Sequence, residues 1–80
     1  MAAIKRYTSN FSQKDLSSDD ILTLTFATTI ATPLYAVIAY STTGISTAPT
    51  GLKKISDTSV EVNVSECPTG THIIHIFYEI

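Results

Sequence analysis

Short segments in which apolar and polar residues alternate recur along the chain, and this pattern limits the choice of fold more than any other feature. In residues 60–64, three valines alternate with a glutamate and an asparagine. In residues 21–26, Leu22, Leu24 and Phe26 alternate with threonines and an isoleucine. Successive side chains of a β-strand point to opposite faces, so each segment predicts a strand with one buried face.

Turn-forming residues separate these segments. Residues 52–55 and 60–64 flank a turn and predict a β-hairpin. Residues 34–40 and 71–80 are apolar on both faces, and a strand of that kind is expected to be covered on both faces. The sequence therefore predicts an all-β fold, a small antiparallel β-sandwich or partly open barrel of about six to seven short strands.

The same pattern divides the chain into two parts. Residues 1–11 are expected to form an N-terminal arm or edge strand, and residues 12–80 a single β-sandwich domain. Residues 12–20 are polar and rich in capping residues, so one helical turn at most is expected there. Around Ile45, between two turns, we expect a loop or a short edge strand.

The length and the cysteine count limit how such a domain is stabilised. A chain of 80 residues is small, and a domain of that size has marginal stability unless disulfides, metals or oligomerisation add to it. Cys67 is the single cysteine, so an intramolecular disulfide and a cysteine-based zinc site are excluded. Oligomerisation is the remaining source of stability.

Charge and hydropathy exclude several partners. The net charge is -2 and 15% of residues are charged, which does not suit a nucleic-acid-binding protein. The first residues lack the apolar core of a signal peptide, so synthesis in a cytoplasm without export is expected. The uncharged residues 21–40 are long enough to span a bilayer. Their threonines and the central Pro33 favour strands joined by a turn instead.

Catalytic and metal-binding patterns are weak throughout. His72 and His75 are three residues apart in a predicted strand, so they point to opposite faces and do not share a metal ion. A metal bound by His75 from several subunits stays an alternative. The aspartates of residues 15–20 are interpreted as turn formers, and Cys67 as a thiol without a catalytic role. We therefore expect no enzyme, no cofactor and no small-molecule substrate.

The second face of the last predicted strand carries large apolar groups that a small core does not require. If no second sheet of the same chain covers them, they form an exposed patch, and such a patch marks a protein interface. The sequence thus gives five candidate contact residues, Ile73, His75, Phe77, Tyr35 and Val37.

Several short stretches together resemble a known family. They are Asp15-Leu16 and Asp19-Asp20 before residues 21–24, residues 35–40 before Gly44, residues 57–64, and Thr69-Gly70-Thr71. In this order they resemble a small β-module of tailed-bacteriophage virion proteins, found in tail and head fibres and as short structural proteins. The chain departs from the module at residues 28–32, where a Leu-Gly pair is usual, and in lacking a tryptophan in its last strand.

The resemblance implies a non-enzymatic virion component, usually a trimer, that attaches to other virion proteins. A short chain of this type suits capsid decoration or fibre anchoring. Two alternatives stay open. One is a receptor- or glycan-binding tail-fibre adhesion module, with Tyr35, Tyr40 and the loops at residues 42–50 as contact groups. The other is a small single-span membrane protein.

Overall fold

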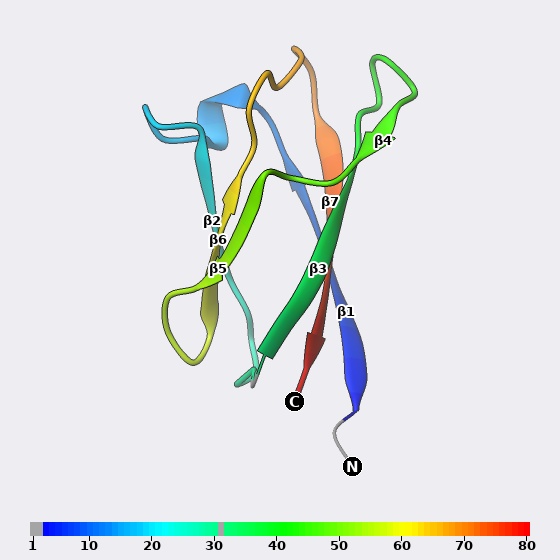
Figure 1. The fold of residues 1–80 in the computed structure, drawn as a ribbon. Coiled ribbons are helices and arrows are strands. Elements are labelled where there is room, and N and C mark those ends of the chain that lie inside the picture. Colours follow the sequence, from blue (N-terminus) through cyan, green and yellow to red (C-terminus); the bar gives the residue numbers. More distant parts are fainter. Residues whose placement is uncertain (1–2, 31) are drawn as a thin grey trace.

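Two antiparallel β-sheets pack face to face in the computed structural model, which describes residues 3–30 and 32–80 (Figure 1). The strands are β1 Ile4–Phe11, β2 Ile21–Thr25, β3 Thr32–Ala39, β4 Ser46–Thr47, β5 Gly51–Lys54, β6 Ser59–Asn63 and β7 His72–Glu79. One sheet has the order β1-β7-β3-β4 and the other the order β2-β6-β5. The all-β sandwich is thereby confirmed, and within the described residues the sheets do not close into a barrel.

The three-stranded sheet follows the alternating pattern of its sequence. Leu52 of β5 and Leu22 of β2 both lie opposite Val62 of the central strand β6. The side chains of Val60 and Val62 are fully buried. Because β-branched residues suit the extended backbone, and because only one face of this sheet meets the core, the predicted hairpin and the predicted strand at residues 21–26 are both confirmed.

The four-stranded sheet is centred on β7, which pairs with β1 on one side and with β3 on the other. Alternate β7 residues, beginning with His72, point toward the second sheet and are buried. Phe26, just after β2, stacks on Tyr7 of β1 with ring centroids 4.4 Å apart. The same ring lies 4.9 Å from that of Tyr78. These three aromatic rings join the sheets along the side where β1 and β2 lie.

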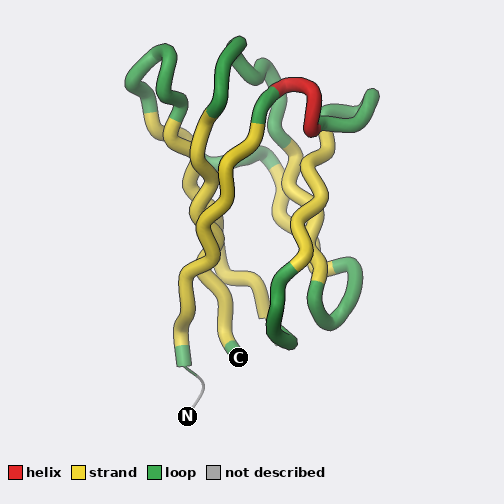
Figure 2. The backbone as a smooth tube through the Cα atoms, turned by 180° about the vertical axis from the view of Figure 1, so that it is seen from behind, coloured by secondary structure: helices red, strands yellow, loops and turns green. Residues whose placement is uncertain are grey.

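The chain crosses between the sheets through loops gathered at the two ends of the sandwich (Figure 2). At one end the helical turn η1, Gln13–Asp15, follows β1, and the Ser12 backbone N–H donates to Asp15 Oδ2 at 2.8 Å. Gly70, with φ +102°, turns the chain into β7, and a Cβ there would lie 2.7 Å from Thr42 Cγ2. The start of β1 and the C-terminus lie at the opposite end (Figure 1).

The N-terminal segment is part of the sandwich. Residues 4–11 form β1 at the edge of the four-stranded sheet, and Phe11 is buried in the core. Residues 1–2 lie outside the described part of the chain. Around Ile45 the chain forms an exposed turn before the two-residue edge strand β4. In the described residues, no helix has the length and apolar character needed to cross a membrane.

One expectation about residues 34–40 is wrong. They were expected to be covered on both faces, but Tyr35 is 54% exposed and Leu34 is 39% exposed. Ala36 and Ile38 point into the core, and the opposite face of β3 points to solvent. The second sheet covers only one face of the first, and among the described residues there is no third layer to cover the other face.

Candidate functional site

The five candidate contact residues lie together on the outward face of the four-stranded sheet. Because β3 is the neighbour of β7, the pairing register places Tyr35 opposite Phe77 and Val37 opposite His75. The rings of Tyr35 and Phe77 stack, with centroids 4.6 Å apart and planes inclined by 20°. Ile73 lies further along β7 on the same face and is 39% exposed. We call these five residues the outward patch.

Polar residues border the outward patch on the side of β1. Arg6 lies opposite Phe77, and Thr8 lies opposite His75. Thr8 Oγ1 and His75 Nδ1 are 3.2 Å apart, within hydrogen-bond distance. An apolar, aromatic centre with a polar border is the composition of a protein-binding surface.

A β-bulge sets which residues of β3 reach the outward patch. The register between β3 and β7 shifts between Pro33 and Tyr35, so Leu34 is the additional residue of β3. Pro33 therefore pairs with the inward-facing Tyr78, whereas Tyr35 pairs with the outward-facing Phe77. A bulge of this kind re-aims the side chains that follow it.

The two histidines occupy opposite faces of β7, as their spacing predicts. His72 is fully buried, whereas His75 lies on the outward face and is partly exposed. Ser41 N–H donates to His72 Nδ1 at 3.2 Å, so Nε2 carries the proton and donates to the Pro68 carbonyl at 2.9 Å. His72 is thus a hydrogen-bonded core residue. Nowhere in residues 3–30 and 32–80 do three or more acidic, cysteine or histidine side chains gather as metal ligands would.

Cys67 lies in the loop between β6 and β7 and is partly buried. Burial raises the pKa of the Cys67 thiol, and the nearby Asp20 carboxylate raises it further. A raised pKa keeps the sulfur protonated, which is the opposite of what a nucleophilic cysteine requires. Asp20 itself has a φ of 61° in the turn before β2, and its carbonyl accepts a hydrogen bond from Val64 N–H at 2.9 Å.

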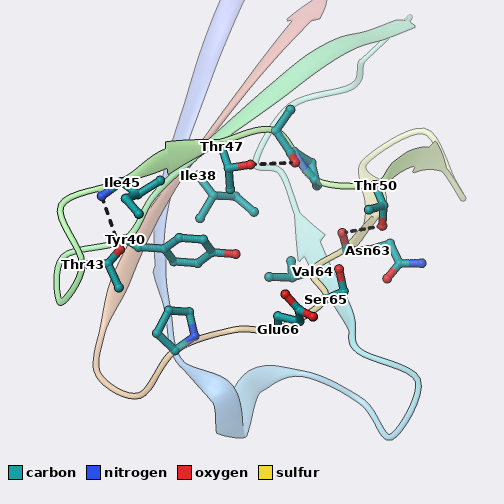
Figure 3. Close-up of a pocket in the computed structure, with 13 residues that line it drawn as sticks. Ile38, Tyr40, Thr43, Ile45, Thr47, Thr50, Asn63, Val64, Ser65 and Glu66 are labelled. Carbon is teal, nitrogen blue, oxygen red and sulfur yellow. Dashed lines mark hydrogen bonds between the residues drawn. The ribbon is translucent and has the colours of Figure 1, made fainter.

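A cavity of about 360 Å³ opens at the loop end of the sandwich, between the chain from β3 to β5 and the loop after β6 (Figure 3). Ile45, Pro49 and Pro68 supply accessible apolar wall, whereas the side chains of Ile38 and Val64 behind it are buried. The ring of Tyr40 extends across the cavity toward the segment of Val64, Ser65 and Glu66 (Figure 3). Its ring is held edge-on to His72, with centroids 5.0 Å apart. The volume lies at the lower end of the range for ligand sites, about 300–1,000 Å³.

Sequence reasoning pointed to only part of this cavity. Tyr40 and the loops at residues 42–50 are the predicted contact groups of an adhesion module. Six residues of those loops line the cavity: Thr43, Ile45, Thr47, Ala48, Pro49 and Thr50. Asn63, Ser65 and Glu66 are not among the predicted contact residues. Asn63 is expected only as an outward residue of the strand at 60–64, and Ser65 and Glu66 only as part of the turn that follows it. A weak signal was present, since polar residues there follow directly on a predicted buried strand.

Comparison with known proteins gives no match: no protein-family model, no curated protein and no solved structure matches this chain.

Proposed function

We propose that this chain is a non-enzymatic structural protein of a tailed-bacteriophage particle, which decorates the capsid or anchors a fibre by protein–protein contacts. The observation that supports the proposal is the outward patch. Its stacked Tyr35 and Phe77 lie on the rigid central strands of a sheet, where Tyr35 is 54% exposed and Phe77 is half-buried. Aromatic residues exposed on rigid elements are typical anchors of protein interfaces.

The proposal includes self-association, with a trimer as the expected form. A domain of 80 residues has a small core, and burial of the outward patch between copies adds apolar area that the monomer leaves in water. The resemblance to virion modules supplies the setting, in which the oligomer docks on other virion proteins. Capsid or tail genes beside the gene for this chain would support that setting.

The mass of the protein in solution tests the self-association. Light scattering on the wild-type chain is expected to give a multiple of 8.6 kDa. Phe77→Asp places a charge in the centre of the outward patch, so we expect it to lower the assembled fraction by at least tenfold, because burying an unpaired carboxylate is costly.

A matched control places the same charge on the other sheet. Thr25 is exposed on the outward side of β2, so Thr25→Asp is expected to leave the mass unchanged. Circular dichroism of both variants should retain the β-sheet spectrum. A wild-type chain that stays monomeric at all concentrations would contradict self-association. Assembly that Phe77→Asp leaves intact would contradict the location of the interface.

A further inference from the structure

The cavity at the loop end presents polar groups that have no partner within the protein. Within the described part of the chain, the hydroxyls of Tyr40 and Ser65 and the carboxylate of Glu66 form no hydrogen bond. Glu66 has a φ of 56°, a left-handed conformation that few non-glycine residues adopt. These polar groups therefore lie at the cavity without forming hydrogen bonds within the described protein.

Hydrogen bonds within the loops make the lining rich in acceptors. Thr47 Oγ1 donates to the Ala48 carbonyl at 3.4 Å, and Thr50 Oγ1 donates to the Asn63 carbonyl at 3.3 Å (Figure 3). Each hydroxyl therefore has its proton engaged and offers lone pairs to the cavity, and the Glu66 carboxylate offers only lone pairs. A ligand that fits this lining must bring several donors.

The charge of the lining excludes anions. Among the described residues that line the cavity, Glu66 carries the one charged side chain, and none is lysine, arginine or histidine. A phosphate, sulfate or carboxylate ligand would therefore meet repulsion without a counter-charge. The ligand is neutral or cationic.

The apolar wall and the free hydroxyl donors of the lining decide between a neutral and a cationic ligand. Tyr40 has its hydroxyl proton available, and so does Thr43, whose Oγ1 accepts from Ile45 N–H at 3.3 Å. Donors are of no use to an ammonium group, which has no acceptor, whereas a sugar hydroxyl both donates and accepts. The C–H faces of a sugar ring also suit the accessible apolar side chains of Ile45 and Pro68.

We propose that this cavity binds one neutral sugar unit, with Tyr40 and Glu66 as its principal polar contacts. The inference is independent of the proposed virion role, since the cavity and the outward patch share no residue.

Titration of the isotope-labelled full-length chain, followed by amide chemical shifts, tests the inference. The neutral methyl glycosides of glucose, galactose, mannose and N-acetylglucosamine are the probes, and glucuronate is the matched anion. At least one neutral probe is expected to bind with millimolar affinity and to shift the amides of residues 40 and 63–66. Glucuronate is expected to bind at least tenfold more weakly, because its carboxylate faces Glu66.

Two conservative variants separate the roles of the contacts. Tyr40→Phe keeps the ring against His72 and removes the hydroxyl, so neutral sugar affinity should fall about three- to tenfold, as for one lost hydrogen bond. Glu66→Gln should also weaken the neutral sugar and should in addition relieve the discrimination against glucuronate. Tyr35→Phe, which removes a phenol from the outward patch, is the control and should change neither affinity.

Specific outcomes would overturn the inference. One is the absence of cavity shifts with all four neutral probes at their solubility limit. Another is binding of lysine methyl ester in place of the sugars, which would make the cavity a cation site. A third is equal weakening by Tyr40→Phe and Tyr35→Phe, which would place the sugar elsewhere. Light scattering on the same samples reports assembly separately, so failure of the sugar site and failure of the virion role are distinguishable.

Discussion

At the scale of single residues, His72 shows how one polar side chain organises the loop end of the molecule. Both ring nitrogens are used, one accepting from Ser41 N–H and the other donating to the Pro68 carbonyl. The ring also lies edge-on to Phe11 and Tyr40, at centroid distances of 5.7 Å and 5.0 Å. His72 therefore links the turn after β3, the loop before β7 and the core.

Replacement of His72 by alanine should be strongly destabilising. The change leaves two backbone groups without partners and opens a cavity among aromatic rings, so the free energy of unfolding should fall by about 3 kcal/mol. His75→Ala is the matched control. His75 is partly exposed on the outward face, and we expect a change of no more than about 0.5 kcal/mol. Urea unfolding of both variants at low protein concentration is the measurement, and equal losses would contradict the assigned roles.

Cys67 and Tyr40 give the protein a dependence on alkaline pH. Burial raises the pKa of the Tyr40 phenol, and Cys67 raises it further; burial and Asp20 raise the pKa of Cys67. A group whose folded pKa is raised stabilises the fold below its unfolded pKa, and that stability is lost as the pH rises through the folded value. The free energy of unfolding should therefore fall as the pH rises above about 8.5, the unfolded pKa of cysteine.

Urea unfolding at several pH values between neutral and strongly alkaline measures this decline. Cys67→Ala removes the first titrating group, so the decline should begin at higher pH in that variant. A wild-type chain whose stability is constant across the alkaline range would show that neither group loses solvation on folding.

At the scale of elements, the residues of β7 alternate between the core and the outward face of the sheet. Ile76 is fully buried between the sheets, whereas Ile73 is partly exposed on the other face. Ile76→Ala should lower the free energy of unfolding by about 2–5 kcal/mol, because it removes buried methyl groups and leaves a cavity. Ile73→Ala, the same change on the same strand, should cost less than about 1 kcal/mol in the dissociated chain. Chemical unfolding of the two variants measures both losses. A larger loss for Ile73→Ala than for Ile76→Ala would mean that Ile73, and not Ile76, faces the core.

How much of these elements could be predicted depends on how local the signal is. Period-two alternation fixed the hairpin of β5 and β6 and the inward face of β2, since these depend on neighbouring residues alone. The cover of β3 could not be predicted, because apolar residues on both faces do not reveal whether the chain or a partner covers them. No pattern in the sequence predicts the bulge at Leu34, although the bulge places Tyr35 opposite Phe77.

The candidate sites, too, could be predicted only where the sequence signal is local. Ile73, His75 and Phe77 were placed together because they alternate along one strand. Their proximity to Tyr35 and Val37 follows from strand order, with β3 beside β7, which no local pattern gives. The cavity was the least predictable feature, because it is formed by loops that are distant in sequence and meet only when the sheets pack.

At the scale of the whole molecule, a small sandwich leaves much of its apolar surface in water. Its dimensions are 39 × 24 × 20 Å, so a large share of its residues lies at the surface. One face of the larger sheet is uncovered, and β1 and β2 leave two strand edges on the same side of the sandwich. Lys5 and Arg6 lie on the β1 edge, and charged edge residues oppose uncontrolled pairing of strands. If the chain associates, these edge charges favour contact through the outward patch over contact through the β1 edge.

The dependence of thermal stability on protein concentration follows from this arrangement. If folding and assembly are coupled, mass action favours the folded oligomer as the concentration rises. With an unfolding entropy of about 2.1 cal/mol/K per residue, a tenfold increase in concentration should raise the Tm of a trimer by about 5 °C. Phe77→Asp should lower the Tm and remove the concentration dependence, whereas Thr25→Asp should retain it. Differential scanning calorimetry over a hundredfold concentration range makes the comparison. A wild-type Tm that does not move would mean that the outward patch remains exposed to water in the stable state, and that the domain is stabilised by its core alone.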